Sequence, residues 1–155
     1  MTAPIQLQSY FEQKLPATWF TGPPSIQADD DEILCVGELA EGSSVDEFRA
    51  STRDARMEIA QDVQMLFRRR VSWGVQRGAE TTLFTTYNAP LATRLRLPER
   101  MVLDTLVDAG VARSRSDALG WCVKLVARHQ AEWLDDLRGA LVSVERVRAE
   151  GPTSL

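Results

Sequence analysis

The stretch that decides the fold of this 155-residue chain is Ala92 to Leu119, with the sequence ATRLRLPERMVLDTLVDAGVARSRSDAL. Its first residues alternate polar with apolar side chains, which is typical of a strand that buries one face. Pro98 ends this strand and suits the first turn of a helix, where its missing N–H costs nothing. An apolar helix face then continues to Gly110, which we expect to form a left-handed C-cap.

A second helix is predicted after this glycine. Ser114 or Ser116 can cap it, and Asp117 favours its first turn. The apolar pattern continues well past one ordinary helix, so the last helix is expected to be extended. Its apolar positions include Leu119, Cys122, Val123, Val126, Trp133, Leu134, Leu137, Leu141 and Val144.

This order of strand, proline, short helix, glycine turn and serine-capped long helix resembles the ribbon-helix-helix family, which includes the Arc and methionine repressors. The resemblance covers Ala92 to Arg128. It implies an obligate homodimer in which one strand from each subunit pairs into an antiparallel ribbon that enters the DNA major groove. Residues 89–150 are therefore interpreted as a ribbon-helix-helix domain for dimerisation and DNA binding.

The resemblance also implies roles for individual residues. Base reading from the ribbon is implied for Arg94, Arg96 and, two positions earlier on the same face, Ala92. Family members often carry a polar reader at the position of Ala92, which leaves either a shorter reading surface or a different register. Phosphate binding at the start of the second helix is implied for Arg113, Ser114, Arg115 and Ser116. The dimer core would contain Leu95, Leu97, Leu106, Leu119 and Val123.

The charge distribution favours DNA binding by this segment and not by the whole chain. The sequence has 18 basic and 22 acidic residues, whereas residues 92–128 carry seven basic and four acidic ones. Phosphate affinity comes largely from Lys and Arg, so the C-terminal segment is the part suited to it. Two structural alternatives stay open: alternating Arg and Leu also describes an amphipathic edge strand, and the serines also describe an ordinary helix cap.

The first 88 residues are predicted to form a separate domain, which makes the fold class α+β. After a short helix at Ile5 to Leu15, the pattern indicates β-β-α-β-β, an antiparallel sheet with one long helix across one face. Strands are expected at Ser25 to Ala28, Glu32 to Leu39, Val71 to Gln76 and Thr81 to Tyr87. Ser44 and Glu47 match a capping box, and the helix should end near Arg70. Its apolar stripe contains Phe48, Thr52, Ala55, Ile59, Val63, Leu66 and Phe67.

Two charged clusters in the first domain have structural and functional interpretations. Asp29 to Asp31 are interpreted as a solvated turn, because a metal site would need further carboxylates from elsewhere. Arg68 to Arg70, with Trp73 and Arg77, form either a second basic surface or a helix end that accepts cations. The helix-end interpretation is favoured.

The remaining candidate residues are interpreted as structural. His129 lies on the apolar side of the long helix between Val126 and Trp133, so it is expected to be partly buried. A structural role is favoured over that of a catalytic base, because no recognisable nucleophile accompanies it. Cys35 and Cys122 have apolar neighbours and are interpreted as buried reduced thiols.

These observations predict a small, cytoplasmic, dimeric transcriptional regulator, such as a repressor, and not an enzyme. No catalytic motif, metal-ligand pattern or phosphate loop is recognisable, so no metal or cofactor is expected. No apolar run approaches the ~20 residues that a membrane span needs, and the first residues do not resemble a secretory signal. The expected partners are double-stranded operator DNA and a second copy of the chain. A higher oligomer on DNA and a small-molecule effector of the first domain are further candidates.

A non-DNA-binding dimeric scaffold or protein-interaction protein with the same fold is the alternative. It is motivated by a helix–helix seam that a DNA reader does not need. This seam consists of Leu134, Leu137, Leu141 and Val144.

Overall fold

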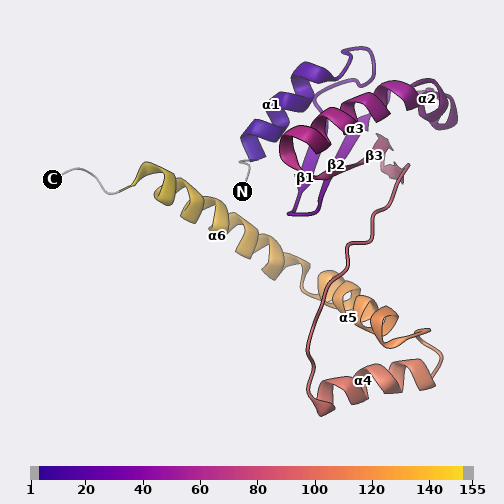
Figure 1. Cartoon of the computed structure of the whole chain (residues 1–155), viewed down its shortest axis with the longest axis vertical. Helices are drawn as coiled ribbons and strands as arrows, with labels where there is room; N and C mark the ends of the chain where they lie inside the picture. Colours follow the sequence, from indigo (N-terminus) through magenta and orange to yellow (C-terminus); the bar gives the residue numbers. More distant parts are fainter. Residues whose placement is uncertain (1–3, 152–155) are drawn as a thin grey trace. The chain divides into compact units, whose positions relative to one another are not determined.

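The computed structural model describes residues 4–151, and the chain divides into two compact units between Leu91 and Ala92. Figure 1 draws the N-terminal unit in indigo to magenta and the helices of the C-terminal unit in salmon to yellow. Each unit has its own apolar cluster, so each is described by itself.

The N-terminal unit contains a four-stranded sheet covered by helices (Figure 1). Its strands are ordered β1-β2-β3-β4 across the sheet. The first three strands lie where the sequence predicts them, but β4 ends at Leu83 and not at Tyr87. The elements are α1 (Pro4–Lys14), β1 (Ser25–Ala28), β2 (Glu32–Glu38), α2 (Val45–Ser51), α3 (Arg53–Phe67), β3 (Arg70–Arg77) and β4 (Glu80–Leu83).

The sheet is mixed, which corrects the prediction of an antiparallel sheet. β1 pairs with β2 and β3 pairs with β4 in antiparallel fashion. The central strands β2 and β3 are parallel, and Cys35 lies opposite Trp73. Between these two strands the chain passes through α2 and α3, and a crossover of this length returns it to the same end of the sheet.

Two helices replace the single long helix predicted after Ser44. The cap itself is confirmed, since Ser44 Oγ accepts a hydrogen bond from the Glu47 N–H at 3.2 Å. α2 nevertheless ends before Thr52, which has φ −95° and ψ 0°. The buried Thr52 hydroxyl donates to the Phe48 carbonyl at 2.6 Å and accepts from Arg56 Nε at 3.0 Å. Such local bonds compete with regular helix geometry, which accounts for the interruption.

The end of α3 and its buried face also differ from the prediction. The helix ends at Phe67 and not near Arg70, because Arg68 adopts a left-handed conformation with φ 58°. Leu66, predicted in the apolar stripe, is 63% exposed, whereas Arg56 is only 7% exposed. The buried face therefore passes through an arginine that hydrophobic periodicity cannot identify.

The core of the N-terminal unit lies where α1 and α3 cover the sheet. Phe11 of α1 packs edge-on against Trp73 of β3, with 6.0 Å between ring centroids. Gly37 makes room for Phe20, because a Cβ at this position would meet the Phe20 ring at 2.3 Å. The buried residues of this core are Leu7, Phe11, Ile33, Cys35, Leu39, Ile59, Val63, Trp73, Val75 and Phe84.

Two sequence interpretations in this unit can be compared with the structure. Cys35 is a free, buried thiol, as predicted, and burial raises its pKa to about 12. Asp29 belongs to the turn between β1 and β2, where its Oδ1 accepts the Asp31 and Glu32 N–H groups at 2.9 and 2.8 Å. These bonds lower the pKa of Asp29. Within the described residues, no cluster of His, Cys, Asp and Glu could hold a metal ion.

Helices are the regular elements of the C-terminal unit in its described part, which ends at Gly151. It contains α4 (Leu97–Asp108), α5 (Arg115–His129) and α6 (Ala131–Glu150). The strand predicted at residues 93–98 is absent from this part of the chain, and Leu97 instead begins α4. A strand needs a second strand to accept and donate its backbone hydrogen bonds, and residues 92–96 have none within the described chain.

The helical boundaries of this unit agree in part with the sequence. Gly110 follows α4 with φ 74°, as predicted, and Ser114 caps α5. The prediction of a single extended last helix is wrong. Gln130, with φ −123° and ψ 29°, separates α5 from α6. In residues 4–151, none of the helices is both long enough and apolar enough to cross a membrane.

Candidate nucleic-acid interface

The segment before α4 exposes the residues predicted to read bases. Ala92, Arg94 and Arg96 are all exposed, and Arg96 has an extended conformation with φ −78° and ψ 172°. Leu95 is half-buried against the apolar cluster of the C-terminal unit. Its carbonyl accepts a hydrogen bond from Arg100 Nη1, which ties the segment to the first turn of α4. Leu95 is therefore the residue of this segment that faces the unit, while the residues on either side of it are exposed.

The residues predicted for the dimer core separate into two groups. Leu95, Leu106 and Leu119 pack within the chain against a cluster that contains Leu103, Ala112 and Ala118. By contrast, Leu97 is 61% exposed and Val123 is 62% exposed. The second group is thus largely uncovered within the described chain.

The start of α5 exposes the residues predicted to bind phosphate. Ser114 Oγ accepts a hydrogen bond from the Asp117 N–H at 3.2 Å, and Asp117 Oδ2 accepts from the Arg113 N–H at 2.9 Å. Ser114 and Ser116 are exposed, and the exposed Arg113 side chain forms an ion pair with Asp117, with 3.9 Å between Nε and Oδ2. The Asp117 carboxylate occupies part of this helix start, which reduces its attraction for an anion.

Arg115 has a structural partner that the sequence analysis missed. Its Nε and Nη2 atoms donate to Asp104 Oδ1 and Oδ2 at 2.6 and 2.7 Å, which joins α5 to α4. This two-pronged bond lowers the pKa of Asp104 and raises that of Arg115. Spacing alone gives no signal for a bond between residues on two different helices.

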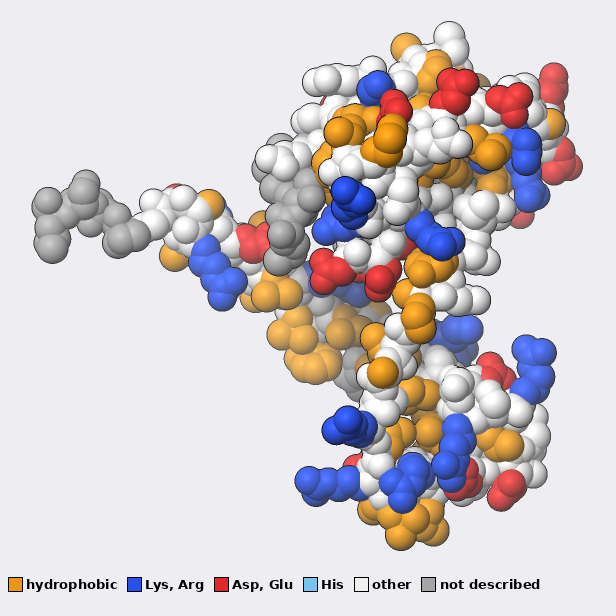
Figure 2. Space-filling view, viewed as in Figure 1, with side chains coloured by type: hydrophobic (Ala, Val, Ile, Leu, Met, Phe, Trp, Pro, Cys, Tyr) orange, Lys and Arg blue, Asp and Glu red, His pale blue; other side chains and the backbone are white. Residues whose placement is uncertain are grey.

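The remaining features of this unit are its basic side chains, His129, Cys122 and the apolar surface of α6. Figure 2 shows basic side chains gathered around α4 and apolar side chains at the surface of α6. His129 is exposed at the end of α5, which corrects the prediction of a partly buried residue. Cys122 is a free, half-buried thiol and is therefore less enclosed than predicted. The exposed apolar residues of α6 are Trp133, Leu137, Leu141, Val142, Val144 and Val147.

The triple arginine of the N-terminal unit does not form one basic surface. Arg68 is the left-handed C-cap of α3. Arg69 is buried and forms an ion pair with Asp30 at 3.7 Å, and the Arg70 guanidinium lies 4.8 Å from the Tyr87 ring centroid. The three side chains thus have three separate local roles. A different group of arginines, on α2 and α3, lines a pocket that the sequence analysis did not identify.

Comparisons with known proteins match both units of the chain. Residues 5–83 match the family model described as the N-terminal domain of Rv1265-like protein. The chain belongs to the Rv1265-like family. Residues 96–148 match a second model, the Mb1296 C-terminal domain. The Rv1265-like N-terminal match ends before the extended segment, and the C-terminal match begins at Arg96, so Arg94 lies between the two.

Two mycobacterial relatives support this assignment. The chain is 49% identical over 155 residues to protein Rv1265 of Mycobacterium tuberculosis strain H37Rv, covering 92% of this chain and 69% of that protein. Protein Mb1296 of Mycobacterium bovis matches with the same identity and coverage. Both relatives are described as uncharacterized, and no solved structure matches the Rv1265-like chain significantly.

Proposed function

We propose that this protein is a dimeric, sequence-specific DNA-binding regulator whose C-terminal unit forms a ribbon-helix-helix module. In this dimer, residues 92–96 of two chains pair as antiparallel strands, and Arg94 and Arg96 face the bases of the DNA major groove. The exposed start of α5 contacts phosphate through its backbone N–H groups, with Ser114 and Ser116 beside them. Arg113 adds positive charge.

The observation that carries this proposal is the small core of the C-terminal unit. Among residues 92–151, only Leu103, Ala112 and Ala118 are buried, while larger apolar residues of α4 and α5 are exposed. A helical domain normally buries one apolar stripe of each helix, so this unit is incomplete as a single copy. A second copy would cover the exposed large apolar residues of α4 and α5, which are Leu97, Met101, Val102, Val123 and Val126.

Dimerisation also accounts for the extended segment before α4. An isolated strand leaves its backbone N–H and C=O groups without protein partners, and pairing with the same strand of a second chain would supply them. The pairing is symmetric, so one face of the ribbon would present Arg94 and Arg96 from both chains. Four guanidinium groups on one ribbon suit the acceptors of guanine bases.

The alternative is a dimeric scaffold without DNA binding, and α6 is the observation that favours it. The twenty residues of α6 include no buried side chain, and its apolar residues recur every three or four positions. Such a stripe is suited to pairing with another helix. It does not by itself require nucleic acid.

Selection of bound sequences from a random double-stranded DNA pool tests the proposal against this alternative. We expect an enriched, roughly palindromic sequence, because two symmetry-related ribbons read two half-sites. Binding to the selected DNA should weaken steeply as salt rises, since bound phosphates release counterions. A chain that enriches no sequence and binds no DNA at low salt would be assigned to the scaffold alternative.

A double variant tests which residues read the sequence. Replacing Arg94 and Arg96 by alanine should cost about 1–3 kcal/mol of binding free energy per lost base contact and relax the sequence preference. The matched control replaces Arg128 and Arg148, two exposed arginines outside the ribbon, and removes the same total charge. An equal loss of DNA-binding free energy in both variants would indicate non-specific electrostatic attraction and would contradict base reading by the ribbon.

A further inference from the structure

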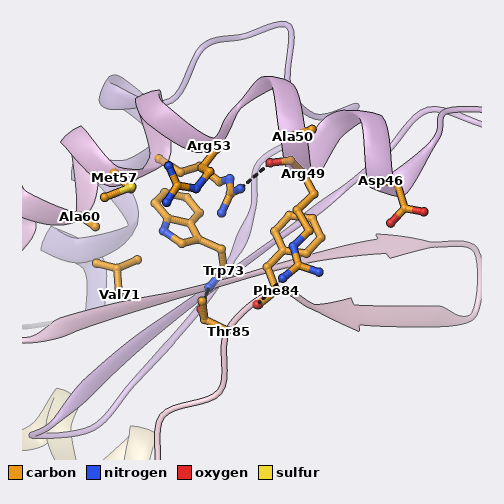
Figure 3. A pocket seen from close by; sticks show the side chains of 11 residues that line it. Asp46, Arg49, Ala50, Arg53, Met57, Ala60, Val71, Trp73, Phe84 and Thr85 are labelled. Carbon is orange, nitrogen blue, oxygen red and sulfur yellow. Dashed lines mark hydrogen bonds between the residues drawn. The ribbon is translucent and has the colours of Figure 1, made fainter.

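The N-terminal unit contains a pocket of about 470 Å³ between α2, α3 and the sheet. Figure 3 shows it from close by, with side chains from both helices on one side and from the sheet on the other. One part of its lining is cationic and comprises Arg49, Arg53 and Arg56. The other part is mainly apolar and includes Met57, Val71 and Trp73. We call this site the arginine pocket.

The three arginines line the pocket from both sides of the interruption at Thr52. Arg49 belongs to α2, whereas Arg53 and Arg56 belong to α3, and the spacings of four and three residues keep them on one side. Arg56 is buried, and its Nη2 donates to the Arg49 carbonyl at 2.7 Å. Because its Nε is held by Thr52, the Arg56 guanidinium is fixed in position. Arg49 and Arg53 are exposed at the mouth.

The positive charge of the arginine pocket is not neutralised within the described chain. In residues 4–151, no carboxylate oxygen lies within 4.0 Å of the Arg49 or Arg56 guanidinium. Arg53 pairs only with the exposed Asp54 at 3.6 Å, and Asp46 lies at one end of the pocket beside Arg49 (Figure 3). An arginine normally enters a protein interior with an anionic partner, because an unpaired buried charge is costly.

Two further observations describe the electrostatic surroundings of these arginines. Desolvation lowers the pKa of Arg56, and the charges of Arg49 and Arg53 lower it further. The Arg56 and Arg49 guanidinium carbons lie 4.9 and 5.6 Å from the Phe84 ring centroid. The aromatic ring partly stabilises both cations but supplies no negative charge. An anion is therefore the group that this site lacks.

We propose that the arginine pocket binds a small organic anion, a phosphate or carboxylate attached to a planar or apolar body. The anionic group would bind Arg49 and Arg53 in front of the fixed Arg56, and the body would lie against Met57, Val71 and Trp73. The volume is within the usual range for small-molecule sites, which combine an apolar lining with a few polar groups. This inference does not rest on the DNA-binding proposal, because every lining residue belongs to the N-terminal unit.

Calorimetric titration of the full chain tests the two halves of the site separately. The probes are phenyl phosphate, phenol, which lacks the charge, and inorganic phosphate, which lacks the ring. We expect phenyl phosphate to bind more tightly than either fragment, and its affinity to fall as salt rises. Equal affinity for phenyl phosphate and phenol, or no heat from phenyl phosphate at millimolar concentration, would overturn the proposal.

A pair of double variants locates the binding. Replacing Arg49 and Arg53 by glutamine should weaken phenyl phosphate binding by about tenfold or more, because charge-assisted hydrogen bonds are lost. Both residues are exposed, so the fold should be retained. The matched control, Arg70→Gln with Arg77→Gln, removes the same charge from the same unit outside the pocket and should leave binding unchanged. Equal weakening by both double variants would overturn the assignment.

A third variant keeps the test independent of arginine removal. Met57 is 48% exposed at the pocket, and Met57→Glu would place a carboxylate beside the arginines. We expect it to abolish phenyl phosphate binding, whereas Met57→Gln should weaken it much less. Retained binding in Met57→Glu would show that the anion lies elsewhere.

Discussion

The two units of this chain differ in how completely they bury their own apolar residues. In its described part, the N-terminal unit has ten buried apolar residues in one cluster, including Phe11 and Trp73. The C-terminal unit, as far as Gly151, buries only Leu103 and two alanines, and it leaves large apolar side chains exposed on all three helices. The first pattern is that of a self-contained apolar core, and the second, on the proposed dimer, would be completed by another copy of the chain.

The largest expected effect comes from opening the core of the N-terminal unit. Phe11→Ala should lower the free energy of unfolding by about 3–5 kcal/mol, because it leaves a cavity beside Trp73. Urea denaturation followed by tryptophan fluorescence measures this loss. Met65→Ala, at a residue that is 69% exposed, is the control and should change stability by less than about 0.5 kcal/mol. Similar losses in the two variants would contradict the assignment of a self-contained core.

The exposed residues of the C-terminal unit should behave differently from surface residues of a monomer. Val123→Gln and Leu141→Gln should each weaken self-association by roughly 1.5–3 kcal/mol per buried side chain. Sedimentation equilibrium measures the dimer dissociation constant, and Arg148→Gln is the exposed control. Sensitivity to Val123 alone would place the interface on α5, and sensitivity to Leu141 alone would place it on α6. A monomeric wild-type chain would contradict the proposed dimer.

A smaller effect is expected from the bond between the two helices of the C-terminal unit. The folded state lowers the pKa of Asp104, so the pair stabilises the fold above the range where an unfolded aspartate titrates. This stabilisation is lost as pH falls through the lowered pKa. Asp104→Asn should therefore destabilise the unit at pH 7 and have no effect in strong acid, as measured by urea midpoints. The control is Asp108→Asn, which removes the same charge from an exposed position of the same helix and should change the urea midpoint at pH 7 much less.

The smallest effect is expected from a hydroxyl inside the N-terminal unit. Tyr10 Oη is buried without a hydrogen-bond partner among the described residues, and desolvation raises the pKa of Tyr10. Tyr10→Phe removes an unsatisfied polar group, so the free energy of unfolding should be unchanged or rise by less than about 1 kcal/mol. Differential scanning calorimetry measures the change. A clear loss of stability would mean that the hydroxyl has a bonding partner.

Local signals in the sequence predicted local structure well. Ser44 and Ser114 cap helices, and Gly110 adopts the expected positive φ, because each depends only on neighbouring residues. The interruptions at Thr52 and Gln130 were missed because hydrophobic periodicity continues across both. The direction of β3 was also missed, since alternation of side chains carries no information on strand polarity.

The candidate sites show the same division between local and non-local information. The exposure of Arg94 and Arg96 follows from alternation with leucine, whereas the bond between Arg115 and Asp104 depends on how α4 and α5 pack. The arginine pocket was missed because its residues match no motif and the sequence surrounds them with acidic residues. Burial of Arg56 becomes evident only when α3 lies on the sheet.

The one non-helical residue at Gln130 has a consequence for assembly. Successive residues of a helix differ by roughly 100° in direction, and a continuous helix would lock the apolar stripes of α5 and α6 into one fixed phase. Because Gln130 interrupts the helix, the apolar stripes of α5 and α6 do not have to follow this one phase. If the proposed dimer forms through α5, the apolar stripe of α6 would remain for a second neighbour, and dimers could then join into longer arrays.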